Sequence, residues 1–280
     1  MAAERDDDLR RRYLRQQAEL GGAEMVLSAP AAGEPRRRLP DPVPEEVPMA
    51  EKPKAEQPRA EQPKAGGEER KWMKGAPAIP GPGLDAMPGI IPPELVALES
   101  LDRIAERIRS TYCCETLCPN RTNAVPGEGN PRARLMLVGE APGQNEDEQG
   151  RPFIGAAGQL LTSILQAVEL RREDVFIANV VKCRPPQNRK PLPHEVQSCI
   201  PYLWRQIELI RPAVLLAMGS TAAEALLGVK KSLGELRGKV HSYGGIPLVV
   251  TYHPAALLRN PNWKKPTWDD VRIARQLIDR

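Results

Sequence analysis

The sequence has little that is typical of a membrane or a secreted protein. We find no run of about 18 consecutive apolar residues, the length that a membrane span needs. The charged N-terminus, MAAERDDDLRRRYLRQQ, is not followed by an apolar segment, which argues against a secretory signal. We therefore expect a cytoplasmic protein without a membrane segment. A formal net charge of +4 permits a polyanionic partner without requiring one.

Aromatic residues are scarce, at 4% of the chain, and no cysteine occurs before Cys113. The five cysteines are an odd number and include no Cys-x-x-Cys pair, which argues against a disulfide framework and against a thiol redox enzyme. Free buried thiols and metal ligation are the two remaining interpretations. Four thiolates suit zinc or an iron–sulfur cluster, and the spacing does not choose between them.

Large apolar residues are nearly missing from the first part of the chain. Half of the 30 prolines lie before residue 98, and the charged segment AEKPKAEQPRAEQPKAGG repeats itself loosely. Such a segment buries too little apolar surface to offset the entropy of ordering. We therefore expect residues 1–90 to be a disordered extension, either a tether or an arm for an unknown partner, and residues 91–280 to be the folded domain.

Beyond residue 91, short apolar runs alternate with segments of helical periodicity. The expected strands are 135–138, 175–181, 213–218 and 247–252. The expected helices begin near Pro93 and cover 158–170, 194–210, 220–227 and 268–278. In the fourth of these helices, Thr221 and Glu224 are spaced as a capping box. The alternation predicts an α/β fold with a parallel sheet covered on both faces.

Each expected strand ends on a distinctive residue. Glu140 follows the first, Asn179 lies in the second, Ser220 follows the third, and His253 follows the fourth. Because the carboxyl ends of parallel strands share one edge, we expect these four side chains to converge on one cleft. The loop after the first strand is rich in glycine, which lets a backbone approach a ligand closely. Phe153 in that loop offers a flat face to a flat substrate.

The residues at the strand ends have a structural and a functional interpretation. Asn179 forms a core hydrogen bond or reads the edge of a planar heterocycle. His253 is a capping or surface histidine, or it donates to negative charge on a leaving group, and its place before Pro254 favours the second. Leu257 and Leu258 pack a loop or form an apolar wedge for a base stack.

Basic residues gather near the expected strand ends, as ordinary surface charge or as phosphate contacts. They are Lys182, Arg184, Arg189, Lys190, Arg259, Lys264 and Lys265. Trp263 and Trp268 lie in a basic loop, where they stack on bases or pack the loop.

Four segments in order, GEAPGQNEDEQGRPFIGAAGQLL, NVVKCRPPQNRKPLPHE, LLAMGSTAA and TYHPAALLR, carry a family resemblance. Over about residues 95–280 the chain resembles the iron–sulfur-containing uracil-DNA glycosylases of family four. The resemblance implies a monomeric three-layer α/β/α sandwich with a four-stranded parallel sheet. It also implies hydrolysis of the bond between uracil and deoxyribose in DNA, which leaves an abasic site for base excision repair, and a structural 4Fe–4S cluster.

The resemblance also implies roles for individual residues. Phe153 stacks on the extruded uracil, Asn179 pairs with its edge, and His253 stabilises charge on its O2 atom. Glu140 positions water or contacts the base. The implied substrate-binding set is Gly139, Ala141, Gly143, Phe153, Asn179, Ser220 and His253, and the implied DNA wedge is Leu257, Leu258 and Arg259.

The implied cluster ligands are Cys114, Cys118, Cys183 and Cys199. The family usually separates its first two cysteines by two residues, whereas here Cys113 and Cys114 precede Cys118 at a different spacing, so Cys113 is the substitute for Cys114. Two alternatives stay open: a glycosylase of the same fold for another deaminated base such as hypoxanthine, and a non-catalytic, metal-containing nucleic-acid-binding module.

Overall fold

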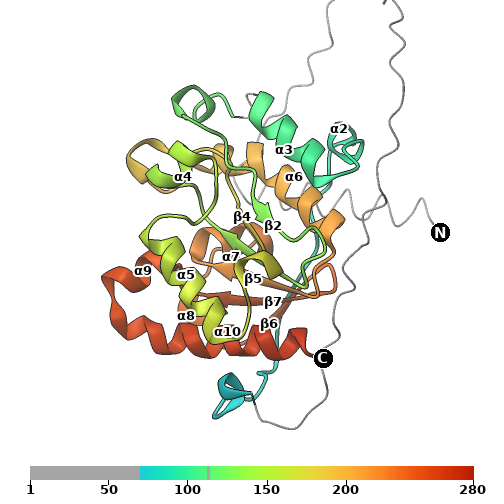
Figure 1. Ribbon diagram of the computed structural model, residues 1–280. Coiled ribbons are helices and arrows are strands. Elements are labelled where there is room, and N and C mark those ends of the chain that lie inside the picture. Colours follow the sequence, from blue (N-terminus) through green and yellow to red (C-terminus); the bar gives the residue numbers. More distant parts are fainter. Residues whose placement is uncertain (1–69, 112–113) are drawn as a thin grey trace, which may run out of the picture.

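The computed structural model describes residues 70–111 and 114–280, which fold around one seven-stranded sheet (Figure 1). The strand order is β1-β6-β7-β5-β3-β4-β2. The strands are β1 (Pro82–Ala86), β2 (Glu128–Gly129), β3 (Leu135–Gly139), β4 (Phe176–Asn179), β5 (Val214–Met218), β6 (Val240–Tyr243) and β7 (Ile246–Thr251). The expected count of four strands is wrong, but the four central strands β7, β5, β3 and β4 do run parallel.

The three strands that the sequence did not reveal lie toward the edges. β2 has two residues and pairs antiparallel with β4. β6 joins β7 in a hairpin through Gly244 and Gly245, which both adopt positive φ, as a tight hairpin turn requires. β1 pairs parallel with β6 in a proline-rich stretch. None of the three has the continuous apolar run that identifies a buried strand.

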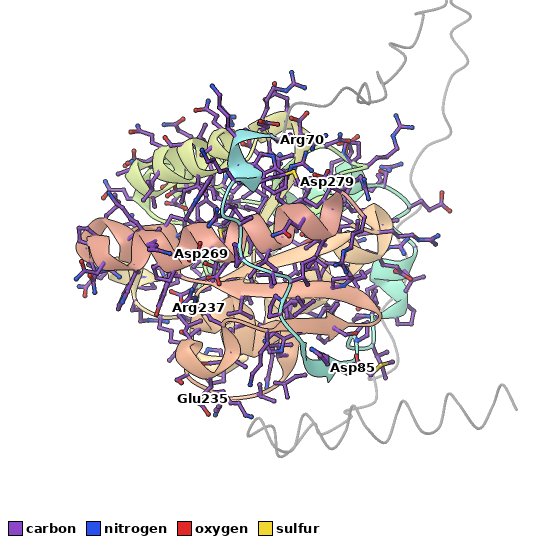
Figure 2. All side chains as sticks on the ribbon, turned by 90° about the horizontal axis from the view of Figure 1, so that it is seen from below. Arg70, Asp85, Glu235, Arg237, Asp269 and Asp279 are labelled. Carbon is purple, nitrogen blue, oxygen red and sulfur yellow. The ribbon has the colours of Figure 1, made fainter. Side chains whose placement is uncertain are left out.

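The expectation that residues up to 90 lie outside the fold is wrong for residues 70–90. β1 belongs to the sheet, and Trp72 is buried, with Arg275 over its ring at 5.3 Å. Arg70 forms an ion pair with Asp279 at 2.9 Å, beside the end of the last helix (Figure 2). The rest of the predicted extension, residues 1–69, lies outside the described residues.

The helices flank the sheet. The α-helices are α2 (Pro93–Val96), α3 (Leu101–Ser110), α4 (Gln144–Gln149), α5 (Ala156–Ala167), α6 (Pro193–Ile210), α7 (Ser220–Leu227), α8 (Leu233–Leu236), α9 (Pro254–Arg259) and α10 (Lys264–Ile278). Short 3-10 turns are η1 (Lys71–Met73), η2 (Cys118–Asn120), η3 (Arg172–Asp174), η4 (Pro186–Asn188) and η5 (Pro261–Trp263). The helix expected near Pro93 is thus divided into α2 and α3, and α4 and α9 occupy segments expected to be loops.

Two apolar cores lie on opposite faces of the sheet. Along β3, Leu135 and Leu137 pack in one core with residues of α5 and α10, whereas Met136 and Val138 pack in the other with residues of α6 and α7. Since successive side chains of a strand point to opposite faces, the sheet is covered on both sides and the three-layer architecture is confirmed. Within the described part of the chain, no helix combines the length and apolarity that crossing a bilayer requires.

Candidate active site

A cavity of about 490 Å³ lies at the carboxyl ends of the four central strands. Glu140, Asn179, Ser220 and His253 all line it, so the expected convergence of the strand ends is observed. Three further residues of the predicted set, Ala141, Gly143 and Phe153, also line the cavity, as does Arg259. The parallel register places Gly139 opposite Asn179 and Met218 opposite Thr251, which aligns the ends of neighbouring strands.

Two buried polar atoms of this site have no hydrogen-bond partner within residues 70–111 and 114–280. They are Oδ1 of Asn179 and Nε2 of His253. Nδ1 of His253 accepts a hydrogen bond from the N–H of Ala255 at 3.2 Å, so in the neutral ring the proton sits on Nε2. Burial, assisted by the charge of Arg259, lowers the pKa of His253 from 6.5 to about 4. At neutral pH two residues that line the cavity therefore supply one acceptor and one N–H donor that have no partner in the described part of the chain.

Phe153 lies against this pair of residues. Its ring centroid is 5.3 Å from that of His253, with the planes tilted by 35°. A Cβ at Gly139 would lie 2.6 Å from Cζ of Phe153 and 2.4 Å from Oδ1 of Asn179. Gly139 is therefore the residue that lets the phenylalanine ring and the asparagine amide meet above the end of β3.

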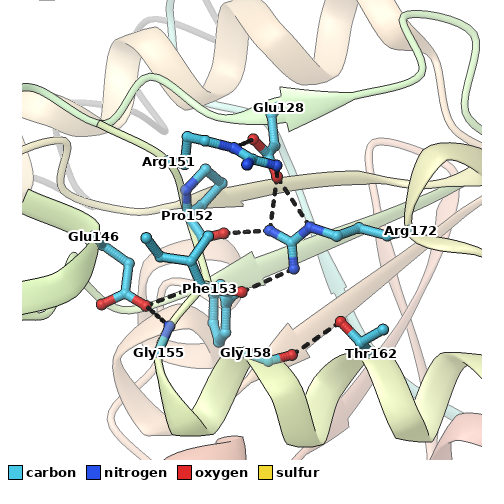
Figure 3. A network of polar contacts seen from close by, with 10 residues as sticks. Glu128, Glu146, Arg151, Pro152, Phe153, Gly155, Gly158, Thr162 and Arg172 are labelled. Carbon is cyan, nitrogen blue, oxygen red and sulfur yellow. Dashed lines mark hydrogen bonds and ion pairs between the residues drawn. The ribbon is translucent and has the colours of Figure 1, made fainter. Parts of the chain in front are cut away.

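The loop that carries Phe153 is held by Glu146 of α4 (Figure 3). Its carboxylate accepts hydrogen bonds from the N–H groups of Ile154 and Gly155 at 2.9 Å, and from the N–H of Gly143 at 3.1 Å. One carboxylate thus ties together the two ends of the glycine-rich loop. Glu146 was not among the predicted site residues, although it lies three residues after Gly143, the position from which a glutamate caps the start of a helix.

Arg172 of η3 fixes the same loop from the other side (Figure 3). Its guanidinium donates to the carbonyl of Phe153 at 2.8 Å and to that of Pro152. It also donates to Glu128 at 2.8 and 2.9 Å, and Arg151 binds the same carboxylate at 2.8 Å. Burial opposes ionisation of Glu128, but hydrogen bonds from both arginines hold its pKa below the ordinary value.

Glu140 is bound by Thr221, a residue that was predicted to cap a helix. The hydroxyl of Thr221 donates to its carboxylate. Helix α7 begins after Gly219 without a side-chain cap, so the predicted capping box of Thr221 and Glu224 is wrong. Glu224 instead pairs with Lys190 at 3.2 Å. Thr221 therefore orients Glu140 at the cavity wall.

Two of the residues predicted to contact DNA are buried. Leu257 is 1% exposed, so its predicted role as a wedge is wrong, because α9 turns it into the core. Leu258, at 49% exposure, remains available for that role. Lys182 is wholly buried and does not face phosphates: its ammonium donates to the carbonyl of Asn179 at 2.9 Å and to Oε1 of Gln206 at 2.8 Å.

The four predicted cysteine ligands are all buried, away from the lining of the cavity. Sγ of Cys118 lies 3.6 Å from Sγ of Cys183, and Arg121 donates to both sulfurs at 3.5 and 3.2 Å. Cys114 contacts the hydroxyl of Thr116 at 3.2 Å.

The same hydroxyl connects these cysteines to α6. Thr116 donates to Glu195 at 2.9 Å, and Cys199 lies one turn after Glu195 on that helix. Residues 70–111 and 114–280 contain no group of three or more His, Cys, Asp or Glu arranged around a single metal ion. Cys113, the alternative ligand, lies outside the described residues.

Comparison with known proteins identifies the family to which this chain belongs. The model of the uracil DNA glycosylase superfamily matches residues 126–274. The type-4 uracil-DNA glycosylase of Saccharolobus solfataricus is 45% identical over 190 residues, which cover 65% of this chain and 88% of that protein. The type-4 enzyme of Thermotoga maritima is 44% identical over 186 residues, covering 65% of this chain and 96% of that protein.

A more distant relative is the type-5 uracil-DNA glycosylase of Thermus thermophilus, with 36% identity over 157 residues, 48% of this chain and 70% of that protein. The matched region contains all four strand ends that border the cavity. The chain therefore belongs to the uracil DNA glycosylase superfamily and, within it, to the type-4 uracil-DNA glycosylases.

Proposed function

We propose that this protein removes uracil from DNA by hydrolysing the bond between the base and deoxyribose, which leaves an abasic site. The observation that carries the proposal is the cavity shared by Phe153, Asn179 and His253, in which one acceptor and one donor are buried without a partner in the described chain. A base in a duplex is out of reach of such a cavity, so the nucleotide has to be flipped out of the stack.

The three side chains match the parts of a uracil ring. Phe153 supplies a flat surface, and base–aromatic stacking is worth about 1–3 kcal/mol. In this proposal Oδ1 of Asn179, which has no partner in the described chain, accepts from the N3–H of uracil, while the amide nitrogen donates to O4. Cytosine has no N3–H and carries an amino group at position 4, so the same asparagine would leave buried polar groups unpaired.

His253 supplies the electrostatic contribution to bond cleavage. As the glycosidic bond breaks, negative charge develops on the uracil ring, including O2. A neutral imidazole with its proton on Nε2 donates that N–H to O2, while Nδ1 keeps the hydrogen bond from Ala255. Removing one preorganised donor of this kind typically lowers the rate on the order of 100- to 1000-fold. Glu140, held by Thr221, is proposed to position the attacking water or to contact the base.

We also propose that the cysteines hold a 4Fe–4S cluster with a structural role. The donor chemistry fits, because four buried thiols come from three segments and the guanidinium of Arg121 donates to two of them. In a 4Fe–4S cluster each iron binds about one cysteine thiolate. The four cysteines therefore do not have to surround one common metal ion. Cys114, Cys118, Cys183 and Cys199 would then join the segment after α3 to β4 and α6.

Iron and sulfide content, with the visible absorption spectrum of the purified protein, tests the cluster. We expect a brown protein with about four irons per chain. A colourless protein with one zinc would contradict the proposal. The cytoplasmic location and the monomeric state expected from the sequence stay predictions.

The activity is tested with single-stranded and duplex oligonucleotides that each contain one uracil, hypoxanthine or xanthine, with the free base identified by mass spectrometry. We expect uracil release that is strongly reduced in Asn179→Ala and His253→Ala. The matched control is His194→Ala, since His194 is exposed and lies outside the cavity lining. Release of hypoxanthine without uracil would identify a glycosylase for another base, and binding without release of any base would identify a non-catalytic module.

A further inference from the structure

Three flat groups are stacked at the mouth of the cavity, beside the site already described. The rings of Trp263 and Tyr252 are parallel within 4°, with centroids 4.7 Å apart. The guanidinium of Arg237 lies over Tyr252, 4.4 Å from the ring centroid. Trp263 and Tyr252 both line the cavity, as does Arg259. Two members of the stack therefore border the cavity in which the uracil ring is proposed to bind.

The inner end of this stack is firmly anchored. Arg237 donates to Asp270 at 2.7 Å and to the carbonyl of Pro266 at 2.8 Å, and its side chain is largely buried. Asp270 is buried as well and accepts a further hydrogen bond from Thr251 at 2.8 Å. The support beneath Tyr252 is thus a buried ion pair with both partners hydrogen-bonded, an arrangement that holds a side chain in one position.

The outer end of the stack is also fixed, but through its backbone. The hydroxyl of Thr267 donates to the carbonyl of Trp263 at 2.8 Å, and Asn260 accepts from the N–H of Asn262 at 3.2 Å within the same turn. The backbone that carries the indole is therefore fixed, and the indole itself is already stacked on Tyr252 before any ligand arrives. A preformed surface of this kind binds a partner with little loss of conformational entropy.

Trp263 nevertheless remains 36% exposed. One face of its ring is stacked on Tyr252, so the opposite face and the ring edge are the parts of the ring that a ligand can reach. If Trp263 served only to pack its loop, we would expect the ring to be covered on both faces. Lys264 and Lys265 follow directly and are exposed, and Arg259 lies nearby on the cavity rim. An open aromatic face beside cations is the combination that binds single-stranded nucleic acid.

We propose that Trp263 is a stacking platform for the nucleobase next to the uracil in the same DNA strand. The proposal rests on the function proposed above and adds a second base-binding site to it. When the uracil enters the cavity, its neighbour loses a stacking partner in the DNA. The open face of Trp263, supported by Tyr252 and Arg237, replaces that partner. The platform thereby offsets part of the cost of extruding the uracil and reads no sequence, because every base has a flat face.

The test removes the neighbouring base without removing its phosphate. Three single strands each contain one uracil: one intact, one with a tetrahydrofuran residue on the 5′ side, and one with it on the 3′ side. Dissociation constants and single-turnover release are measured for the wild type, Trp263→Ala, Trp263→Phe and Lys265→Ala. The side chain of Lys265 is 83% exposed and pairs with Asp269 at 3.0 Å, so this variant removes one surface charge beside the platform without the loss of an aromatic face.

We expect the wild type to bind and process one of the two interrupted strands roughly 10-fold less well than the intact strand, the effect of losing one stacked base. Trp263→Ala is expected to lose about the same factor on the intact strand and nothing more on that interrupted strand. Trp263→Phe retains part of the effect, and Lys265→Ala weakens binding to all three strands equally.

The platform would be overturned if Trp263→Ala and the missing base weakened binding additively. It would also be overturned if the wild type bound and processed both interrupted strands as well as the intact strand. The wild-type comparison needs no variant, so a misfolded Trp263→Ala leaves the test intact. Failure of the proposed function is a separate result, namely no uracil release from the intact strand. In that case the binding measurements still decide whether Trp263 senses the neighbouring base.

Discussion

Replacing Arg172 with alanine is predicted to weaken uracil release without any loss of a residue that lines the cavity. The guanidinium binds the carbonyls of Pro152 and Phe153 on one side and Glu128 on the other. The backbone of Phe153 is held at φ = +51°, a conformation that costs a non-glycine residue about 1–3 kcal/mol and persists only where its surroundings enforce it. Without Arg172 this segment is expected to relax and to move the ring away from its place beside His253.

The magnitude follows from the contacts that are lost. A polar group left buried without its partner costs about 1–3 kcal/mol. Because the loop is able to turn its carbonyls to water, we expect a loss of folding stability at the lower end of that range. Loss of base stacking, about 1–3 kcal/mol, corresponds to a fall of roughly 5- to 150-fold in kcat/KM. Arg172→Lys should resemble Arg172→Ala, since an ammonium lacks the fork that reaches two carbonyls and a carboxylate together.

The assay is single-turnover uracil release from a single strand, together with the thermal unfolding curve, at a temperature at which both variants are folded. Arg171→Ala is the matched control, because Arg171 is the adjacent arginine but is exposed and pairs with Asp174 on the surface. An Arg172→Ala protein with activity within about twofold of the Arg171→Ala protein would refute the reasoning, since stacking of one base is worth more than that.

Three further predictions concern the cavity and its rim. Because the pKa of His253 is about 4 instead of 6.5, uracil release should stay level from neutral pH down to about pH 5, whereas a midpoint near pH 6.5 would contradict a buried neutral imidazole. Between these two pKa values the unfolded chain binds a proton at His253 that the folded chain does not, so the free energy of unfolding should decrease as the pH falls through that window, as urea titrations would measure. Leu258→Ala should reduce uracil release from duplex DNA more than from single-stranded DNA, because Leu258 is exposed. Leu257→Ala should instead lower folding stability by about 2–5 kcal/mol, because Leu257 is buried. The reverse pattern would assign the wedge to Leu257. Gly139→Ala should reduce activity at least about 10-fold, because its Cβ would lie too close to both Asn179 and Phe153; full activity in that variant would show that the end of β3 rearranges freely.

The central part of the fold was predictable because burial on both faces gives β3, β4, β5 and β7 continuous apolar sequences. Those runs located the strand ends, and the parallel register then brought Asn179 and His253 together. The edge strands carry no such signal: β6 alternates between half-buried and buried residues, and β1 contains a proline and a glycine. Their pairing is a tertiary effect that local sequence does not encode.

The errors in the site have physical causes that the sequence pattern does not show. Leu257 and Leu258 are adjacent and chemically identical, and only the helical geometry of α9 decides which one is buried. Thr221 fits a capping motif by spacing, yet its hydroxyl finds a charged acceptor from another strand end, Glu140. Lys182 resembles a phosphate contact until the fold encloses it behind Asn179. Thr221 and Lys182 thus depend on partners distant in the sequence, Glu140 and Gln206, whereas the helix that carries the two leucines decides which of them is buried.

The central claim is that one ring, one amide and one imidazole surround a single extruded base. The most direct measurement is a crystal structure of the protein with free uracil bound. We predict that the base stacks on Phe153, with its N3–H donating to Oδ1 of Asn179 and its O2 accepting from Nε2 of His253, both at about 2.7–3.2 Å. Uracil bound outside this cavity, or bound within it while both atoms remain unpaired, would contradict the account.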